Sequence, residues 1–349
     1  MGDGDSAAGR GGPTTLVTGG AGFVGSAVVR QLVQSGHRVR VLIRLTSDSR
    51  NLRSLPVDVV TGDLTDYRSL RQAITGCDFL FHAAADYRLW VPKPQEMYEN
   101  NVQGTEKIMQ EALRAGVRKI IYTSSVATLR LNGNGAPADE TSAASLTDMI
   151  GHYKRSKFLA EAAVLQLIET RGLPAVVVNP SAPVGPRDIK PTPTGRFIAD
   201  AVSGRMPAYV NTGLNIVHVD DVAKGHLLAL EHGRIGERYI LGGHNMMLKE
   251  ILLEVASFAG CRPPFVRIPH TAILPIAVLS EAWARCASKS APRVTLDGVR
   301  MAKKRMFFSS EKAERELGYA PRPAREALQD AVRWFRQNGY CNKPDPRKR

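Results

Sequence analysis

The sequence has no hydrophobic run long enough to span a membrane. In its C-terminal third the longest apolar run covers residues 272–279 and is interrupted by Pro275, whereas a spanning helix needs about 20 apolar residues. Residues 1–13 are rich in Gly, Asp and Ala and contain no apolar segment of the kind found in signal peptides. We therefore expect a disordered leader over 1–13 and a cytoplasmic protein.

Metal-ligand spacing is also missing. The four cysteines, Cys77, Cys261, Cys286 and Cys341, lie far apart in the chain, so we expect reduced thiols and no metal site. The net charge is +14, from 47 basic and 33 acidic residues. The basic residues are scattered and are not interleaved with aromatic ones, which argues against a nucleic-acid partner.

Short Val- and Ile-rich runs alternate with amphipathic helical patterns through the first half of the chain. This rhythm predicts a Rossmann-type, doubly wound parallel α/β sheet with helices on both faces. The expected strands are 15–17, 38–43, 58–61, 79–82, 119–123 and 175–178, and the expected helices are 23–34, 98–114 and 152–169. We assign 14–180 to this core and 181–349 mainly to a smaller α/β substrate-capping region, from which about 214–242 return to the core.

The segment TGGAGFVG, from Thr18 to Gly25, predicts a dinucleotide-binding loop because it follows a strand and opens a helix. Gly19 permits a tight turn, Gly22 lets the backbone approach a pyrophosphate, and Gly25 allows the helix to pack closely on the strand. Phe23 and Val24 begin the helix, whose N-terminal amides would face the phosphates.

Arg44 follows the second strand, at the place where an acidic residue would hold the adenosine ribose of NAD. With Thr46 and Ser47 beside it, Arg44 can bind a 2′-phosphate, so NADP is preferred and NAD stays possible. The alternative is that Arg44 is only a solvated cation at the end of a strand.

Two further strand ends contribute candidate cofactor contacts. Asp63, followed by Leu64, ends the third strand and could accept a hydrogen bond from the adenine amino group. Ala83 and Ala84 end the fourth strand, where small side chains leave room for the cofactor. Ordinary packing explains these alanines equally well.

Tyr153 and Lys157 lie four residues apart and therefore share one face of a predicted helix. A cation near the phenol would lower its pKa from about 10, so that Tyr153 could act as an acid or base near neutral pH. Alone the pair could be a surface contact. The glycine loop upstream favours a hydride-transfer enzyme.

These motifs resemble the extended short-chain dehydrogenase/reductase superfamily, in particular its epimerase/dehydratase and dihydroflavonol reductase group. The matching segments occur in the family's order: TGGAGFVG, GDL, HAAA, NVQGT, YTSS, YKRSK and HVDDVA. The segments ADYRLW, DMIGHYKRSK, GPRDIKPTPTGR and VTLDGVRMAKKRMFFSS are similar to those of the bacterial hopanoid-associated sugar epimerase subgroup. This resemblance implies a role in building the polar side chain of hopanoid lipids.

The resemblance also implies roles for individual residues. Ser125, with Ser124 as its competitor, would bond the reacting oxygen, Tyr153 would be the general acid/base, and Lys157 would bind the nicotinamide ribose. Pro180, followed by Ser181, would face the nicotinamide amide. Asn101 would be a structural support or a cofactor contact. The segment His218 to Asp221 would fix the capping region to the sheet.

The sequence departs from nucleotide-sugar epimerases at three places. Asn179, 129–131 and Leu214 with Asn215 stand where those epimerases carry an arginine, a Val-Tyr-Gly and an Arg-Asp pair. The acid pair of dehydratases is also missing at 125–127. We therefore favour a reductase slightly over an epimerase that oxidises transiently, and both over a non-catalytic NADP-binding regulator.

Two interactions are expected beyond the substrate. Residues 273–289 combine an apolar start with a basic end and could lie on an anionic bilayer, although packing on the protein's own core is the simpler expectation. By resemblance, the helices 98–114 and 152–169 would form a homodimer contact.

Overall fold

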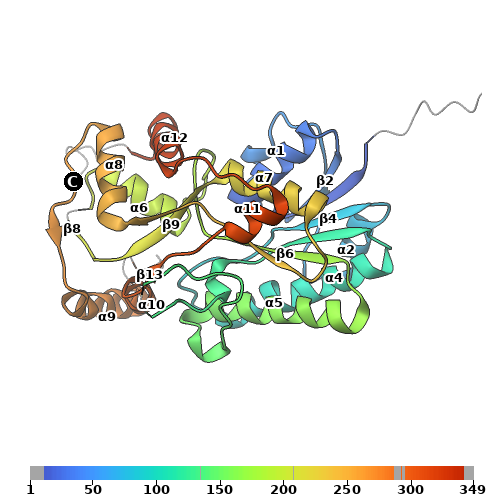
Figure 1. Cartoon of the computed structure of the whole chain (residues 1–349), viewed down its shortest axis with the longest axis horizontal. Helices are drawn as coiled ribbons and strands as arrows, with labels where there is room; N and C mark the ends of the chain where they lie inside the picture. The colour runs from blue at the N-terminus through green and yellow to red at the C-terminus, as the bar shows by residue number, and fades with distance from the viewer. Residues whose placement is uncertain (1–11, 134, 207, 287–291, 293–294, 342–349) are drawn as a thin grey trace, which may run out of the picture.

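A computed structural model of the chain describes residues 12–133, 135–206, 208–286, 292 and 295–341. Nearly all of the expected leader, and the basic residues 343–349, lie outside these described residues. Figure 1 shows two parts side by side: a larger α/β region built mainly from the first half of the chain, and a smaller region built mainly from the second.

The larger region contains one seven-stranded sheet in which every pair of neighbouring strands is parallel. The strand order is β10-β6-β5-β4-β1-β2-β3. The strands are β1 (Thr14–Thr18), β2 (Arg38–Ile43), β3 (Val57–Thr61), β4 (Phe79–His82), β5 (Lys119–Thr123), β6 (Ala175–Pro180) and β10 (Arg238–Leu241). The direction of winding reverses between β1 and β4, which is where such sheets bind ligands. The predicted Rossmann-type fold is confirmed.

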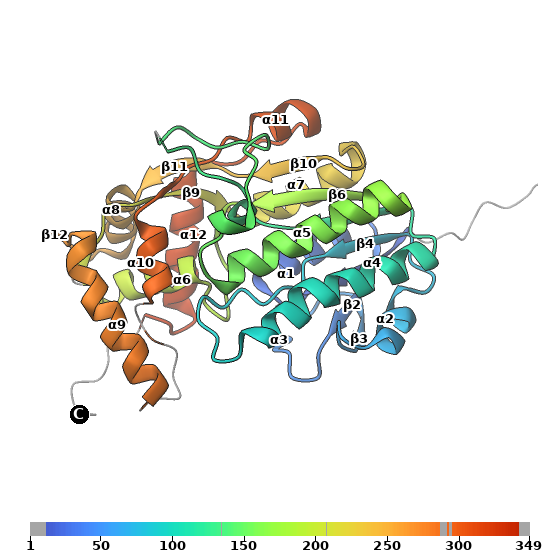
Figure 2. The same cartoon turned by 90° about the horizontal axis from the view of Figure 1, so that it is seen from below.

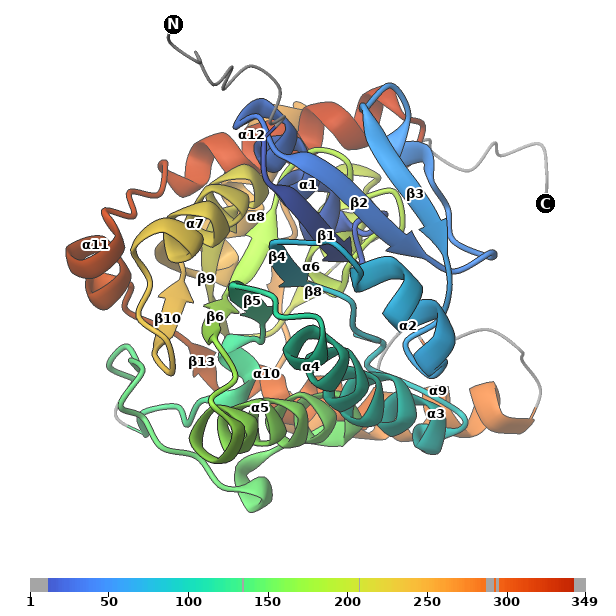
Figure 3. The ribbon, with the colours of Figure 1, turned by 90° about the vertical axis from the view of Figure 1, so that its right-hand side faces the viewer.

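Helices cover both faces of this sheet (Figure 3). One face carries α1 (Phe23–Gln34), α7 (Val219–His232) and α11 (Glu311–Leu317), and the other carries α2 (Tyr67–Ile74), α4 (Gly104–Arg114) and α5 (Gly151–Arg171). In β1, Leu16 packs into one of these cores and Val17 into the other. Burial on both faces explains why the strands are continuously apolar.

The helix predicted over 98–114 is interrupted. It consists of α3 (Pro94–Tyr98), a π-helical turn (Glu99–Gln103) and α4. Asn101 lies inside the π turn, where its side-chain amide bonds both the amide and the carbonyl of Asp86 and donates to the Ser156 hydroxyl. Helical periodicity alone could not reveal this insertion, because it is stabilised by tertiary hydrogen bonds. Asn101 is thus a structural link between three segments.

The smaller region is built on a mixed sheet of β7 (Ala182–Val184), β9 (Gly213–His218), β11 (His244–Met247) and β13 (Arg305–Met306). Its core is closed by α6 (Pro193–Val202), α8 (Leu248–Ala259) and α12 (Ala324–Gln337). The segment 214–242 is divided between the two regions. Strand β9 belongs to the small sheet, whereas α7 and β10 join the large one.

At the rim of the smaller region, β8 (Ala208–Tyr209) pairs with β12 (Val266–Arg267), which leads into α9 (His270–Cys286) and α10 (Leu296–Ala302). Within the described residues, no helix is both long and apolar enough to cross a membrane. The same part of the chain contains no cluster of acidic, His and Cys side chains suited to a metal. Cys77, Cys261 and Cys341 are free thiols.

Candidate active site

The glycine loop joins β1 to α1 at the switch point of the sheet. Gly19 has φ +72°, and a Cβ there would lie 2.6 Å from the Ala84 amide nitrogen. A Cβ on Gly25 would lie 2.2 Å from the Gly19 carbonyl oxygen. Gly22 is exposed at the start of α1, where within 4 Å a Cβ would meet only the Gly19 oxygen. The helix N-terminus is therefore open to an anionic group such as a pyrophosphate.

The two residues that begin α1 after Gly22 differ in their surroundings. Phe23 is buried in the core shared with α7, whereas Val24 is half-buried at its edge. Their part in the site is therefore to anchor the helix start and to present its backbone amides.

The predicted adenosine contacts follow β2 and β3. Arg44 is exposed directly after β2, and its amide donates to the Ser47 hydroxyl. Burial opposes ionisation of Asp63, but hydrogen bonds from Thr65 and the charge of Arg44 outweigh it and lower the pKa of the Asp63 carboxyl. Leu64 lies close to the start of α4, where a Cβ on Gly104 would be 2.8 Å from its side chain.

The end of β4 is held to β1 by a buried hydrogen-bond chain. The amides of Ala83 and Ala84 donate to the carbonyl and the hydroxyl of Thr18. His82 bonds the Thr18 hydroxyl through Nδ1 at 2.7 Å and the Thr105 hydroxyl through Nε2 at 2.9 Å. Burial and the nearby Lys157 charge lower the pKa of His82 to about 3, so the ring is neutral. This role of His82 could not be read from the sequence, because it depends on Thr18 and Thr105, which are distant in the chain.

Ser125 and Tyr153 meet at the carboxyl end of β5. Ser125 caps the short 3-10 helix Val126–Thr128, and its Oγ accepts from the Ala127 amide at 3.1 Å. Ser125 also lies close enough to the Tyr153 phenol to lower its pKa, against the effect of burial. Ser124 is buried and donates instead to the Glu161 carboxylate. This difference supports Ser125, and not Ser124, as the serine that faces a reacting group.

Lys157 is buried one turn after Tyr153. Its Nζ donates to the Thr123 carbonyl at 2.9 Å and to the Tyr122 hydroxyl at 3.2 Å. Burial lowers the pKa of Lys157 to about 8, against an opposing influence of the Glu161 charge. We expected Lys157 to lower the pKa of the Tyr153 phenol. In this structure burial raises that pKa against an opposing influence of Ser125, and the lysine side chain turns toward β5 instead of the phenol.

Glu161 continues the same helix face one turn beyond Lys157, and it is not among the residues predicted from the sequence. Its buried Oε2 accepts from the Ser124 hydroxyl, from the Thr128 hydroxyl at 2.9 Å and from the Asn179 amide at 3.0 Å. Its Oε1 pairs with Arg238 at 3.1 Å. The spacing of four residues after Lys157 was the available signal, since it places a carboxylate on the catalytic face of α5.

The end of β6 completes the candidate nicotinamide side. Asn179 donates to the Ser125 carbonyl at 3.0 Å, so it helps to hold the backbone of Ser125 in place. Pro180 ends the strand, and the next residue, Ser181, has a buried hydroxyl that bonds none of the described residues. A ligand amide would satisfy that hydroxyl. Together with the open α1 terminus, this fits a nicotinamide dinucleotide.

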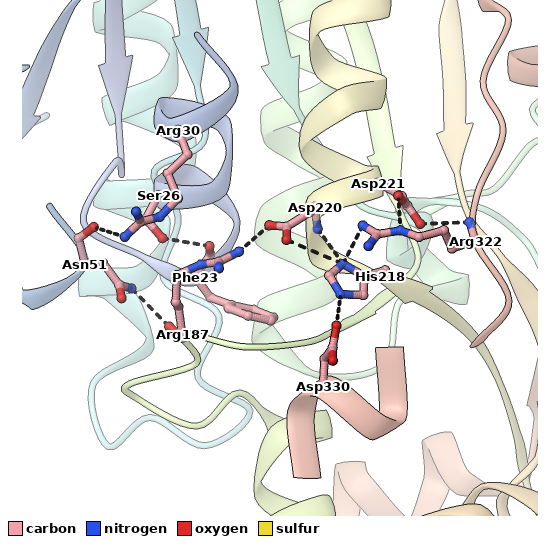
Figure 4. A network of polar contacts seen from close by, with 10 residues as sticks. All are labelled: Phe23, Ser26, Arg30, Asn51, Arg187, His218, Asp220, Asp221, Arg322 and Asp330. Atoms are coloured by element: carbon pink, nitrogen blue, oxygen red, sulfur yellow. Dashed lines mark hydrogen bonds and ion pairs between the residues drawn. The ribbon is translucent and has the colours of Figure 1, made fainter. Parts of the chain in front are cut away.

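A polar network fixes the smaller region to the larger one (Figure 4). His218, at the end of β9, contacts Asp330 of α12 at 3.4 Å, and Asp221 of α7 accepts from Arg322 at 2.9 Å. Asp220 pairs with Arg187, a non-glycine residue with φ +74°. The Arg187 carbonyl accepts from Asn51 in the segment after β2. The role inferred for His218 to Asp221 agrees with these contacts.

A switch-point glycine loop combined with a Ser-Tyr-Lys constellation defines an enzyme that uses a nicotinamide dinucleotide. The chain belongs to the NAD dependent epimerase/dehydratase family, whose model matches residues 15–242. This places it in the extended short-chain dehydrogenase/reductase superfamily.

Individual relatives are similar over nearly the whole chain. A Synechocystis protein with the provisional name dihydroflavonol 4-reductase is 44% identical over 93% of this chain and 95% of its own length. Sterol demethylase protein B of Methylococcus capsulatus is 38% identical over 93% of this chain and 99% of its own. A crystal structure of a protein called gox2253 is 57% identical with a TM-score of 0.85, covering 95% of this chain and 100% of that one.

Proposed function

We propose that this protein is an NADP(H)-dependent reductase of a carbonyl carbon in a sugar-like or lipid-linked substrate of hopanoid side-chain biosynthesis. The observation that carries the proposal is the convergence of Ser125, Tyr153 and Lys157 at the carboxyl end of β5, where burial raises the pKa of the Tyr153 phenol against an opposing influence of Ser125. Such a phenol is protonated at neutral pH. It is therefore ready to donate a proton to an oxygen that gains charge as the carbonyl is reduced.

Each residue of the constellation then has a defined task. When bound, NADPH supplies the hydride that forms the new C–H bond. Ser125 donates a hydrogen bond to the substrate oxygen, and the Tyr153 hydroxyl transfers its proton to that oxygen as the carbonyl π bond breaks. Lys157, held by Thr123 and Tyr122, would bind the nicotinamide ribose, and a solvent proton restores the phenol. The balance is one carbonyl, one hydride and one proton to one alcohol.

The residues that replace the epimerase clamps support reduction over epimerisation. Asn215 donates to Gly243, Asn245 and Phe308 inside the small sheet, so its amide is engaged in the fold. Asn179 is engaged by Ser125 and Glu161. Neither position can supply the cation that holds a nucleoside diphosphate.

The names of two relatives also agree with the proposal. One carries a reductase name, and the other is named for the demethylation of a sterol, which is a polycyclic lipid of the same chemical class as a hopanoid. For the cofactor, the exposed Arg44 after β2 favours NADP because a guanidinium can bind a 2′-phosphate through two hydrogen bonds.

The test is to titrate the purified protein with NADPH and NADH and then to incubate it with extracts of hopanoid side-chain intermediates. We expect stoichiometric loss of NADPH absorbance for each product formed. Product formation without net NADPH loss would establish the epimerase alternative. Cofactor binding with no product in any extract, and no change of that result on replacing Tyr153, would favour the non-catalytic regulator.

We also propose that the active form is a homodimer that pairs α4 and α5 with their copies. These helices lie side by side along one face of the molecule (Figure 2). Sedimentation velocity would show a dimer, and a monomer at all concentrations would contradict it.

A further inference from the structure

Four large apolar side chains are exposed on one helix, α9. Ile276 and Val278 are 51% and 50% exposed, and Leu279 and Trp283 are 70% and 69% exposed. No other helix in the described part of the chain exposes so many large apolar side chains. Figures 1 and 2 show α9 at the outer edge of the smaller region, away from the large sheet.

The polarity of α9 is the reverse of an ordinary surface helix. Its inner face, which packs against α10, buries the small residues Ala277 and Ala284 together with Glu281. The Glu281 carboxylate accepts from the Leu296 amide at 2.7 Å, so this charge is hydrogen-bonded within the protein and does not face solvent. From 271 to 284 no exposed residue is charged. A surface helix normally turns its polar side to water, so this outer face is suited to an apolar medium.

The short strand that precedes the helix also exposes apolar side chains. Phe265 is 88% exposed and Val266 is 44% exposed, and they stand next to the exposed Arg267. Trp283 adds an amphipathic ring of the kind that prefers the lipid headgroup boundary. The exposed apolar residues of the helix are defined here as the α9 surface: Ile276, Val278, Leu279 and Trp283.

The segments next to α9 and in α10 are predominantly basic. Between 262 and 286 and between 295 and 305 the sequence contains seven arginines and lysines but only two acidic residues. One of the two is the buried Glu281, and the other, Asp297, contacts Arg300 at 3.4 Å. Arg262 and Arg267 are exposed before α9, and Arg300 and Lys303 are exposed on or directly after α10, which packs against α9. These four residues, called the basic rim below, give the neighbourhood of the apolar face a positive charge that complements an anionic surface.

A second copy of the chain fits this surface less well. A helix of 17 residues is about 25 Å long, so its exposed face covers only a few hundred Å². A stable protein interface buries roughly 800 Å² on each partner. Two copies would also bring their basic rims together. A lipid bilayer avoids both difficulties, because it accepts a small apolar face and its negative charge attracts the basic residues.

We infer that the α9 surface docks the protein on an anionic lipid bilayer, with the apolar side chains among the headgroups and the basic rim on the lipid phosphates. The inference goes beyond the proposed reaction, and it does not depend on it. The expected leader plays no part in it. Residues 287–289 of the segment 273–289, for which the sequence left membrane contact open beside packing on the protein's own core, lie outside the described residues, and the inference uses only the helix.

The test is cosedimentation of the full chain with vesicles, without cofactor or substrate. Vesicles of phosphatidylcholine alone are compared with vesicles containing phosphatidylglycerol. We expect binding to the anionic vesicles and at least tenfold weaker binding to the neutral ones. The double variant Leu279→Ser with Trp283→Ser should bind anionic vesicles at least tenfold more weakly, since both side chains are already exposed and contribute little to folding.

A matched control replaces two exposed apolar residues elsewhere, Val59→Ser with Ile235→Ser, which are 52% and 56% exposed. This control should bind like the unchanged protein. Equal binding by all three proteins, or no binding to anionic vesicles, would overturn the inference. A dimer in sedimentation velocity that the Leu279/Trp283 variant abolishes would also overturn it, because a second copy would then cover the surface. Reductase activity can fail or succeed independently of each result.

Discussion

Replacing Glu161 by Gln removes the charge at the centre of the network behind Ser125. The carboxylate accepts three hydrogen bonds, from Ser124, Thr128 and Asn179. A hydrogen bond to a charged group contributes roughly 1 kcal/mol more than a neutral one. The loss is therefore about 3 kcal/mol, reduced to about 2 because a neutral amide is less costly to bury than a carboxylate.

The ion pair with Arg238 adds little to this value. The Arg238 side chain is 31% exposed, so it regains water when its partner is neutralised. A loss of about 2 kcal/mol corresponds to a decrease in Tm of roughly 4 °C for a chain of this size. Glu169→Gln is the matched control, since Glu169 is an exposed glutamate on the same helix, and we expect its Tm to be unchanged.

The Glu161 variant should also change the pH dependence of turnover. The Glu161 charge opposes the lowering of the Lys157 pKa, so without it that pKa falls below about 8. The alkaline limb of NADPH turnover that depends on the ammonium then moves to lower pH. Equal Tm values for Glu161→Gln and Glu169→Gln, or an alkaline limb that does not move, would refute this account of the network.

Three further predictions follow from buried or exposed charges. Lys157 has a pKa of about 8 in the folded protein against 10.5 in the unfolded chain. As the pH rises from 7 to 9, the free energy of unfolding of the unchanged protein should therefore increase by about 1 kcal/mol relative to that of Lys157→Met. Equal pH dependence of the two proteins in urea unfolding would contradict this. His82 and His226 have pKa values of about 3 and about 4 because burial keeps them neutral. Unfolding below pH 6.5 should therefore take up two protons. The free energy of unfolding should fall by roughly 2.7 kcal/mol for each unit by which the pH is lowered, down to about pH 4. Calorimetry that shows no such proton uptake would contradict this prediction. Arg44→Ala should weaken NADPH binding about tenfold and leave NADH binding unchanged, in contrast to the exposed control Arg53→Ala, and equal losses for both cofactors would exclude a 2′-phosphate contact.

The large sheet could be predicted because its signals are local. A run such as Lys119–Thr123 is short, apolar and bounded by turn residues, and the glycine loop fixes the connection from β1 to α1. The interruption of the helix at Asn101 could not be predicted, since it depends on Asp86 and Ser156, which are distant in sequence.

The candidate site shows the same division. Spacing alone places Tyr153 and Lys157 on one helix face, but it does not tell which way a long, flexible lysine turns. The structure directs Lys157 to the Thr123 carbonyl, and the pKa of Tyr153 therefore follows its burial. The choice between Ser124 and Ser125 likewise depends on a tertiary contact, because the Ser124 hydroxyl donates its hydrogen bond to Glu161. Tertiary contacts, and not local pattern, decide such details.

The central claim is that the Tyr153 phenol delivers the proton of a hydride-transfer reaction. Its most direct test compares Tyr153→Phe with Tyr67→Phe, an exposed tyrosine on α2, by measuring NADPH-linked turnover and NADPH affinity on the same preparations. We predict that Tyr153→Phe loses at least 100-fold in kcat, within the range for a general acid, and binds NADPH within about threefold of the unchanged protein, whereas Tyr67→Phe changes neither. Full turnover by Tyr153→Phe would contradict the account.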